Sequence, residues 1–194
     1  MRKIISFMHI SLDGFVAGPK GEMNWIKVDE EIFDHVSNRI GEIDTALYGR
    51  VTYEMMESYW PTAAEKPNPS KHDIDHSKWY SKAHKVVLSK TMKDADLANT
   101  TIISDNISEG IAELKSRPTS GASEDILLFG SPTTTHSLIQ LGLIDGFWLF
   151  VNPIILGEGI QLFVDIKDKI KLKLLTTRQF TSGVTELSNT VDRG

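Results

Sequence analysis

The sequence predicts an α/β fold: a mixed, mostly parallel sheet with helices on both faces and an antiparallel hairpin at its C-terminal edge. Short apolar runs alternate with segments of helical periodicity, a pattern typical of parallel strands joined by helices. Near the end of the chain, Thr181-Ser182-Gly183 separates two strand-like segments, and so short a turn indicates a hairpin. With 194 residues, 40% of them hydrophobic, the chain fits one domain, residues 1–194, with a sizeable core.

The expected elements alternate along the chain. The first strand is the apolar segment after Arg2-Lys3, and Ile107, Ile111 and Leu114 have the spacing of a core-facing helical stripe. Residues 61–76 hold three prolines among polar residues and predict a long surface loop, which either covers a site or is only an insertion. We expect helices near 29–40, 52–58, 106–116 and 132–141, and strands near 3–10, 44–48, 84–88, 100–103, 126–129, 146–152, 171–178 and 184–190.

The composition excludes several classes of function. The formal net charge is −5 and no basic run is dense, so a broad nucleic-acid surface is not expected. The absence of cysteine excludes disulfides, thiolate nucleophiles and cysteine-ligated zinc, and it suits a reducing cytoplasm. No apolar run approaches the ~20 residues that a membrane-spanning helix needs, and Asp13 interrupts a faint signal-peptide pattern. We therefore expect a cytoplasmic protein with no membrane or nucleic-acid partner.

Two strand-to-helix junctions carry the strongest functional signal. In Leu127-Leu128-Phe129-Gly130-Ser131-Pro132 an apolar run ends at a glycine, and the Ser-Pro pair suits the N-cap and first position of a helix. Ala46-Leu47-Tyr48-Gly49-Arg50-Val51-Thr52 is a second junction with a built-in cation. Glycine lets a ligand approach the backbone, and unpaired N–H groups at helix starts attract phosphate. The pair predicts a ligand with separated phosphates, such as a dinucleotide; the alternative is two connections that bind nothing.

Five short motifs follow one another within the region from about residue 4 to residue 165. They are Ser11-Leu12-Asp13-Gly14, Tyr48-Gly49-Arg50-Val51-Thr52-Tyr53-Glu54, Lys85-Val86-Val87-Leu88-Ser89-Lys90-Thr91, Phe129-Gly130-Ser131 and Pro153-Ile154-Ile155-Leu156-Gly157-Glu158-Gly159. Together they resemble the dihydrofolate reductase-like family, especially the branch similar to the reductase domain of riboflavin biosynthesis. The resemblance implies a three-layer domain that binds NADPH across the carboxyl ends of its strands, which agrees with the general rule for open α/β sheets.

The resemblance also implies the cofactor-binding residues. Gly49, Arg50 and Thr52 would hold the cofactor's phosphates, with the guanidinium delivering two parallel N–H bonds. Ser89 and Lys90 end the next strand and would receive the 2′-phosphate of NADPH; the alternative is a solvated strand end. The other candidates, which complete the diphosphate cradle or line the nicotinamide, are Gly130, Ser131, Thr133, Thr134 and Ala17. Many relatives have a second glycine in place of the serine at 131, and the proline at 132 removes one N–H donor.

Two acidic residues, Asp29 and Glu30, are the candidates for catalysis. Asp29 and Phe33 lie four apart on one helical face. This spacing resembles that of the carboxylate that binds the pterin ring in dihydrofolate reductases. The interval from Trp25 is one residue shorter than in many of those enzymes, which makes Glu30 the rival. The alternative is that both acids only stabilise the first helical turn through the macrodipole.

Several other residues have a functional and a structural interpretation. His9, on the first strand, either faces the substrate pocket or is a buried, hydrogen-bonded histidine. Asp13 is expected to form a tight turn after that strand. Trp60 is either an apolar wall for an aromatic ring or part of the core. His72 and His76 lie four apart in the expected loop without an obvious third ligand, so no metal site is expected.

Together with the resemblance, these observations predict an NADPH-dependent reductase that needs neither metal nor flavin. Its substrate would be a small heteroaromatic or carbonyl compound, pterin-like or pyrimidine-like. The resemblance further implies a homodimer with the terminal strands in contact. Dihydrofolate reductase proper and a reductase of nitro or other xenobiotic groups remain open within the same fold. The alternative from another class is a nucleotide-binding protein without turnover.

Overall fold

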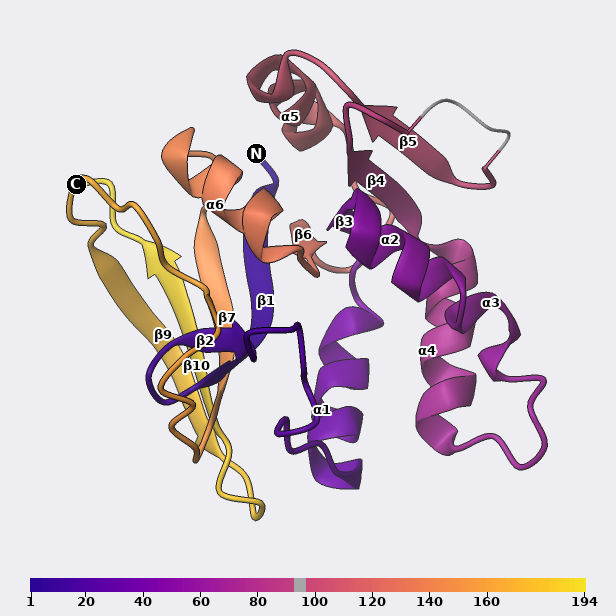
Figure 1. Ribbon diagram of the computed structural model, residues 1–194. Helices are drawn as coiled ribbons and strands as arrows, with labels where there is room; N and C mark the ends of the chain where they lie inside the picture. The colour runs from indigo at the N-terminus through magenta and orange to yellow at the C-terminus, as the bar shows by residue number, and fades with distance from the viewer. Residues whose placement is uncertain (93–96) are drawn as a thin grey trace.

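A mixed eight-stranded sheet organises the chain (Figure 1). The computed structural model describes residues 1–92 and 97–194. The strand order is β5-β4-β3-β6-β1-β7-β10-β9, and β2 pairs with β8 in a separate small sheet. The strands are β1 (Lys3–Ser11), β2 (Phe15–Ala17), β3 (Thr45–Gly49), β4 (His84–Leu88), β5 (Thr100–Ile103), β6 (Asp125–Leu128), β7 (Gly146–Asn152), β8 (Ile160–Gln161), β9 (Leu172–Gln179) and β10 (Thr185–Val191); the helices are α1 (Glu30–Ile40), α2 (Arg50–Glu57), α3 (Trp60–Ala63), α4 (Lys71–Lys82), α5 (Ile107–Ser116) and α6 (Pro132–Gln140).

The pairing of the strands confirms the predicted mixed sheet. Every neighbouring pair from β5 to β7 runs parallel. β10 then runs antiparallel to β7, and β9 runs antiparallel to β10. The turn between these last two strands contains Gly183 at φ +85°, a backbone conformation that favours glycine. The C-terminal edge of the sheet is therefore the expected hairpin.

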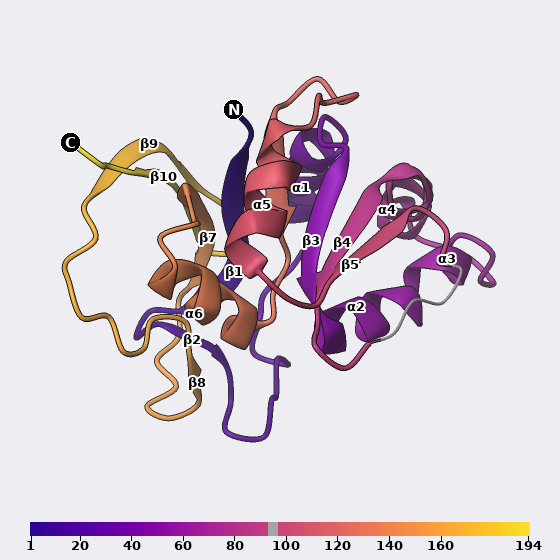
Figure 2. The ribbon, with the colours of Figure 1, turned by 90° about the horizontal axis from the view of Figure 1, so that it is seen from above.

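Helices cover both faces of the sheet (Figure 2). Side chains of β1 alternate between the faces: Ile4 and Met8 pack with buried residues of α5 and α6, whereas Ile5 packs with those of α1. Because β6, β3 and β4 are parallel neighbours, their carboxyl ends lie side by side at one edge of the sheet. In the described part of the chain, no helix has the length and apolar character required to cross a membrane.

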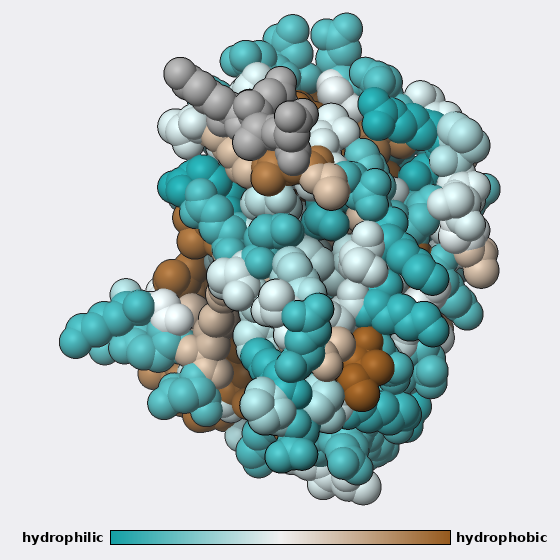
Figure 3. All heavy atoms as spheres, turned by 90° about the vertical axis from the view of Figure 1, so that its right-hand side faces the viewer, coloured by the Kyte–Doolittle hydropathy of each residue, from teal (hydrophilic) through white to brown (hydrophobic). Residues whose placement is uncertain are grey.

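The helix α4, which packs on α1, was not predicted from the sequence. It begins with a capping box, in which the Ser70 hydroxyl accepts from the Asp73 N–H and the Asp73 carboxylate accepts from the Ser70 N–H. Its buried residues are His76, Ser77 and Tyr80, so no aliphatic stripe marks it as a helix. The outer surface on the side of α3 and α4 is also mostly hydrophilic (Figure 3). The predicted loop over residues 61–76 is therefore wrong from Lys71 onward, and also at its start, where α3 (Trp60–Ala63) lies.

Other differences from the predicted elements are small. α1 begins at Glu30 because Asp29 is its N-cap, and α2 begins two residues earlier than expected because Gly49 is its N-cap. The short strands β2 and β8 have three and two residues, too few to show an alternating pattern. α3 occupies the beginning of the expected loop. The elements that form the edge at β6, β3 and β4 lie within a few residues of their predicted positions.

Candidate functional site

The carboxyl ends of β3 and β6 form a narrow cradle of backbone and hydroxyl groups. The Gly49 N–H donates to the Gly130 carbonyl at 2.8 Å, which joins the two strands. The hydroxyls of Ser131 and Thr134 lie 3.2 Å apart beside this bond. A Cβ atom at position 49 would lie 2.9 Å from Ser131 Oγ and still closer to Thr134 Oγ1, so the cradle has room only for glycine there. Gly130 has φ +111° and is followed by a cis peptide bond.

Two helices begin at this cradle, and within residues 1–92 and 97–194 no side chain caps their N-terminal N–H groups. Gly49 is the N-cap of α2 and Ser131 is the N-cap of α6, and neither makes a side-chain capping bond. Ser131 thus occupies the predicted N-cap position, but its hydroxyl faces Thr134 instead of the helix N–H groups. Uncapped N–H groups at helix starts are favourable sites for anions. The cradle therefore offers two sets of donors to a ligand that carries separated phosphates.

Cations and hydroxyls extend the cradle along the sheet edge. Arg50, in the first turn of α2, is exposed and bonds both carboxylate oxygens of Glu54 at 2.8 Å. Such an exposed i,i+4 pair contributes little free energy, so the guanidinium is free to turn to a phosphate. On the neighbouring strand, Leu88 pairs in register with Gly49, and Ser89 and the exposed Lys90 follow it. These residues fit a phosphorylated dinucleotide such as NADPH.

Two adjoining cavities lie beside the cradle. The outer cavity has a volume of about 390 Å³, and the inner one has a volume of about 150 Å³. The outer cavity brings together four of the predicted cofactor residues, Ala17, Thr52, Gly130 and Ser131. The inner cavity lies between the sheet, α1 and α4. Four side chains line both: Phe7, His9, Met56 and Phe129.

The remaining predicted cofactor residues lie outside the lining of the outer cavity, near the ends of β3, β4 and β6. Thr134 contacts Ser131 in the cradle, and Thr133 is exposed in the first turn of α6. Gly49 and Arg50 stand at the start of α2, and Ser89 and Lys90 lie past the end of β4. The structure thus gathers these residues at one edge of the sheet, and their roles toward a cofactor stay predictions.

His9 stands where the two cavities meet. Its ring stacks on Phe150, with centroids 4.9 Å apart, and its Nδ1 lies 3.5 Å from Nδ2 of Asn152. The amide of Asn152 is oriented because its Oδ1 accepts from the Lys27 N–H at 2.8 Å and its Nδ2 donates to the Phe150 carbonyl at 3.1 Å. Since an amide nitrogen only donates, Nδ1 of His9 accepts and the ring proton is assigned to Nε2. Burial lowers the pKa of His9 to about 4, so near pH 7 the ring is neutral.

Two further histidines line the inner cavity from α4. His72 lies face to face with Phe33 and His76 packs against Trp60, each with ring centroids 3.9 Å apart. Burial lowers the pKa of His72, and burial followed by the charge of His72 lowers the pKa of His76 to about 3. The prediction that both lie in a polar loop is wrong, because α4 places them against α1. Trp60 lines the same cavity and also packs against a hydrophobic core cluster, so the structure shows features of both of its interpretations.

His76→Phe should flatten the acid side of the stability profile. A histidine whose pKa is lower in the folded than in the unfolded state binds a proton on unfolding, so stability falls as pH drops from about 6.5 to about 3. Phenylalanine removes this proton and should reduce the slope by about 1.4 kcal/mol per pH unit in that range. Urea unfolding at a series of pH values measures the slope. Parallel profiles for the two proteins would contradict the expectation.

Asp13 ties together two glycine-containing segments beside the outer cavity. A hydrogen bond from the Ser11 hydroxyl, together with those from the backbone N–H groups of Gly157 and Leu156, lowers the pKa of Asp13 to about 2. The two backbone bonds measure 2.8 and 3.1 Å. Further along the loop, a Cβ at Gly159 would overlap the carbonyl of Ala17. Asp13 thus lies in the predicted turn, and it also holds residues 153–159 against β2.

Asp13→Ala should release this loop. Hydrogen exchange at the N–H groups of Leu156 and Gly157 is expected to accelerate by about tenfold, because each loses a charge-assisted hydrogen bond to the carboxylate. Exchange resolved to single residues measures the effect. Glu158→Ala, at an exposed position of the same loop, is the matched control and should leave both rates unchanged. Equal rates in Asp13→Ala and the parent protein would show that the bond does not hold the loop.

The two predicted catalytic acids lie outside the cavities. The Asp29 carboxylate accepts from the Ile32 N–H at 2.9 Å and caps α1, and Glu30 is exposed in the first turn of that helix. No acidic side chain is among the described residues that line either cavity. Asp29 therefore has a structural role as a helix cap. A catalytic role for either acid stays a prediction.

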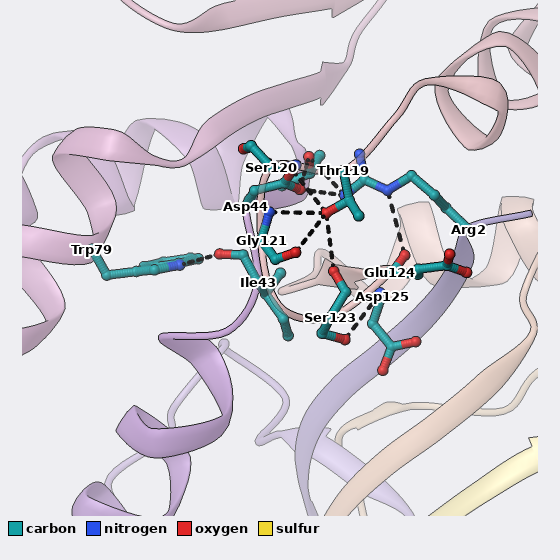
Figure 4. Close-up of polar contacts among 11 residues, drawn as sticks. Arg2, Ile43, Asp44, Trp79, Thr119, Ser120, Gly121, Ser123, Glu124 and Asp125 are labelled. Atoms are coloured by element: carbon teal, nitrogen blue, oxygen red, sulfur yellow. Dashed lines mark hydrogen bonds and ion pairs between the residues drawn. The ribbon is translucent and has the colours of Figure 1, made fainter.

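A larger cavity, of about 500 Å³, lies at the amino ends of the strands, away from the cradle. One of its two lining carboxylates among the described residues, Asp44, is surrounded by Arg2, Thr119 and Ser120 (Figure 4). Burial raises the pKa of Asp44, but hydrogen bonds from the Ser120 N–H and the Thr45 hydroxyl, with the nearby guanidinium, hold it well below its ordinary value. Because the protein itself supplies these partners, we assign this cluster to the stability of the fold.

These features define an α/β protein with the dihydrofolate reductase-like fold and an anion cradle at the carboxyl edge of its sheet. Residues 2–185 match the RibD C-terminal domain, and the chain belongs to this family. Membership indicates an oxidoreductase. The predicted resemblance is therefore confirmed for the family and the fold.

Relatives of known sequence or structure cover nearly the whole chain. The uncharacterized protein YyaP of Bacillus subtilis (strain 168) is 37% identical over 188 residues, which are 96% of this chain and 93% of that protein. The diaminohydroxyphosphoribosylaminopyrimidine deaminase/5-amino-6-(5-phosphoribosylamino)uracil reductase of Thermotoga maritima superposes with a TM-score of 0.65 at 14% identity, over 98% of this chain and 57% of that one. Dihydrofolate reductase from Enterococcus faecalis, complexed with NADP(H), gives 0.60 at 14% identity, over 98% and 96%. The two structural similarities concern the fold.

Proposed function

We propose that this protein is an NADPH-dependent reductase that transfers a hydride to a small heteroaromatic or carbonyl compound. The observation that carries the proposal is the cradle at Gly49 and Gly130, where two uncapped helix N-termini meet at the edge of an apolar cavity. A nicotinamide dinucleotide needs both parts: fixed donors for its diphosphate and an apolar space for its ring. The RibD C-terminal family and the NADP(H) complex of the Enterococcus reductase support the same assignment.

In this proposal, different residues bind different parts of the cofactor. The N–H groups at the starts of α2 and α6 bind the diphosphate, and Arg50 adds a positive charge. Ser89 and Lys90 receive the 2′-phosphate at the end of β4, and Thr52 and Ala17 line the cavity for the nicotinamide. When bound, NADPH supplies the hydride.

His9 supplies the polar contact to the substrate in this proposal. Its neutral ring presents Nε2–H where the two cavities meet, and it donates a hydrogen bond to the heteroatom that gains negative charge. Because the described lining of both cavities lacks an acid, the proton comes from water. This arrangement differs from a dihydrofolate reductase site with a carboxylate against the pterin ring.

Cofactor titration tests the proposal. NADPH should bind at least about tenfold more tightly than NADH, a difference of about 1.4 kcal/mol from one phosphate, and Lys90→Ala should reduce this preference. Lys82→Ala, at an exposed lysine of α4, is the control. NADPH absorbance is then followed with pterins, pyrimidines, quinones and nitroaromatics. If NADPH binds but is not oxidised by any compound of the panel, the non-catalytic alternative is favoured. If NADPH does not bind, the proposal that the cradle binds this cofactor is refuted.

We also propose that two copies of the chain pair through β9. This edge strand is exposed along its whole length, and Leu172, Leu174 and Leu175 are 43, 53 and 58% exposed. An apolar edge strand is a ready template for pairing with another chain. Sedimentation should give a dimer, and Leu174→Lys should shift it to a monomer that still binds NADPH. A monomeric parent protein would rule out the pairing.

A further inference from the structure

We propose that the inner cavity selects the substrate: it admits an uncharged, planar compound with a single six-membered ring, and it rejects phosphorylated or carboxylated analogues. This proposal rests on the proposed function, because the ring would reach from the inner cavity to the outer one, where the nicotinamide is placed. It names the chemical class of the compound that is reduced.

The size of the inner cavity fits one ring. Its volume is about 150 Å³, and an apolar protein cavity of about that volume holds a benzene molecule. A fused two-ring system with a long substituent would exceed this space. The outer cavity, which adjoins it at Met56 and Phe129, leaves room for the reacting group of the substrate.

Flat side chains form much of the inner wall. Phe33 and His72 lie face to face, with an interplanar angle of 15°, and form one aromatic unit between α1 and α4. Trp60 packs against His76 and adds a second. Phe129 contributes a third ring from the end of β6. Planar aromatic ligands gain contact area and favourable ring–ring geometry against such walls.

The two cavities do not provide for a charged group. Among the described residues that line them, none is lysine, arginine, aspartate or glutamate. The titratable side chains among the described residues of the inner cavity are three histidines, and burial lowers the pKa of each, so all are neutral near pH 7. An unpaired anion loses its hydration in such a place without compensation. The phosphoribosyl group in the name of the Thermotoga reductase substrate would meet no cation here.

His9 gives the pocket one directional contact. It lines both cavities, and its Nε2–H is the donor that its contact with Asn152 leaves available. A neutral ring with a carbonyl, imine or nitro acceptor satisfies this donor at the junction of the cavities. The bound ring would therefore present an acceptor group toward the proposed nicotinamide position.

Calorimetry on the cofactor-free protein tests the selection by charge. The probes are para-nitrobenzamide and para-nitrobenzoate, which have nearly the same shape and differ by one charge, and the pair uracil and uridine monophosphate. We expect para-nitrobenzamide to bind at least about tenfold more tightly than para-nitrobenzoate, and uracil more tightly than its phosphorylated nucleotide. The proposal would be overturned if either anion bound as tightly as its neutral counterpart or more tightly. It would also be overturned if neither neutral ring bound.

A lysine in the shared wall should reverse this preference. Met56→Lys places a cation between the cavities, and para-nitrobenzoate should then bind more tightly than para-nitrobenzamide. Val28→Lys introduces the same charge at a 46% exposed position of the inner cavity and serves if the first variant does not fold. Ile74→Lys, on α4 but outside both cavities, is the matched control and should keep the parent preference. An unchanged preference in a folded cavity variant would refute the assignment.

NADPH titration of the same proteins separates the two proposals. If NADPH binds but neither neutral ring does, the substrate assignment fails and the reductase proposal survives. If the neutral rings bind with the expected selectivity but NADPH does not, the cofactor assignment fails instead.

Discussion

Gly49→Ala is expected to lower the affinity for NADPH by about a hundredfold. The added methyl group would overlap Thr134 Oγ1 and approach the Ser131 hydroxyl and N–H, which pushes α6 away from α2. Both helix N-termini lose their alignment toward the proposed diphosphate, and a loss of about 2.7 kcal/mol corresponds to that change in affinity. Fluorescence titration with NADPH measures it. A change of less than about threefold would show that the cradle does not hold the diphosphate.

A rescue variant distinguishes overlap from a general loss of structure. Removing the nearest oxygen with Thr134→Ala in the Gly49→Ala background should restore part of the affinity, because the added methyl group then meets less crowding. Thr134→Ala alone should have a smaller effect than Gly49→Ala. Circular dichroism and the thermal midpoint of each variant report whether the fold is intact.

Lys115→Met is expected to destabilise the fold by about 3 kcal/mol. The Lys115 ammonium bonds the Asp145 carboxylate, and the two side chains are 9 and 11% exposed. Methionine keeps the aliphatic stem and removes the charge, so Asp145 retains the Ile4 N–H and the Arg193 guanidinium as its partners among the described residues. A buried charge that loses its partner typically costs about 3–5 kcal/mol, and the remaining guanidinium places this case at the lower end. Urea unfolding at pH 7 measures the loss.

The pH dependence and a double variant test the cause of this loss. Burial raises the pKa of Asp145, but hydrogen bonds from Lys115 and the Ile4 N–H lower it by more, so the pKa lies below its ordinary value. A depressed carboxyl pKa contributes stability above about pH 4 that is lost as pH falls further, so the difference between parent and Lys115→Met should narrow in acid. Adding Asp145→Asn should recover much of the stability at pH 7, because the amide oxygen still accepts from Ile4. A constant difference at all pH values would contradict this account.

The cradle could be predicted from short segments of the sequence. Gly49 and Gly130 each end an apolar strand and precede a helix, and a parallel sheet places the carboxyl ends of neighbouring strands at one edge. The family motifs then predicted which residues meet there. The same reasoning predicted the Asp13 turn, since Asp-Gly after a strand favours a tight turn. The Asp13 carboxylate also accepts hydrogen bonds from Leu156 and Gly157, which are 143 and 144 positions away in the chain, and no local pattern could predict these bonds.

The inner cavity could not be predicted from the sequence. Its wall depends on α4, whose buried residues include His76, Ser77 and Tyr80, and a helix with so few aliphatic residues shows little apolar periodicity. The Ser70–Asp73 capping box was the available signal for this helix. Asp29 illustrates the opposite case. Its spacing to Phe33 suggested a ligand contact, whereas the folded chain uses its carboxylate as the cap of α1.

The order of strands and helices, the glycine junctions and the family follow from residues that are close together in the chain, because propensity, turn chemistry and motif spacing are local properties. Which side chains share a cavity depends on how α1, α4 and β1 pack. That packing brings His9 next to His72 and His76 in one cavity, although more than 60 positions separate it from them in the chain. Burial in that cavity, which exists only in the folded chain, then lowers the pKa values of all three histidines.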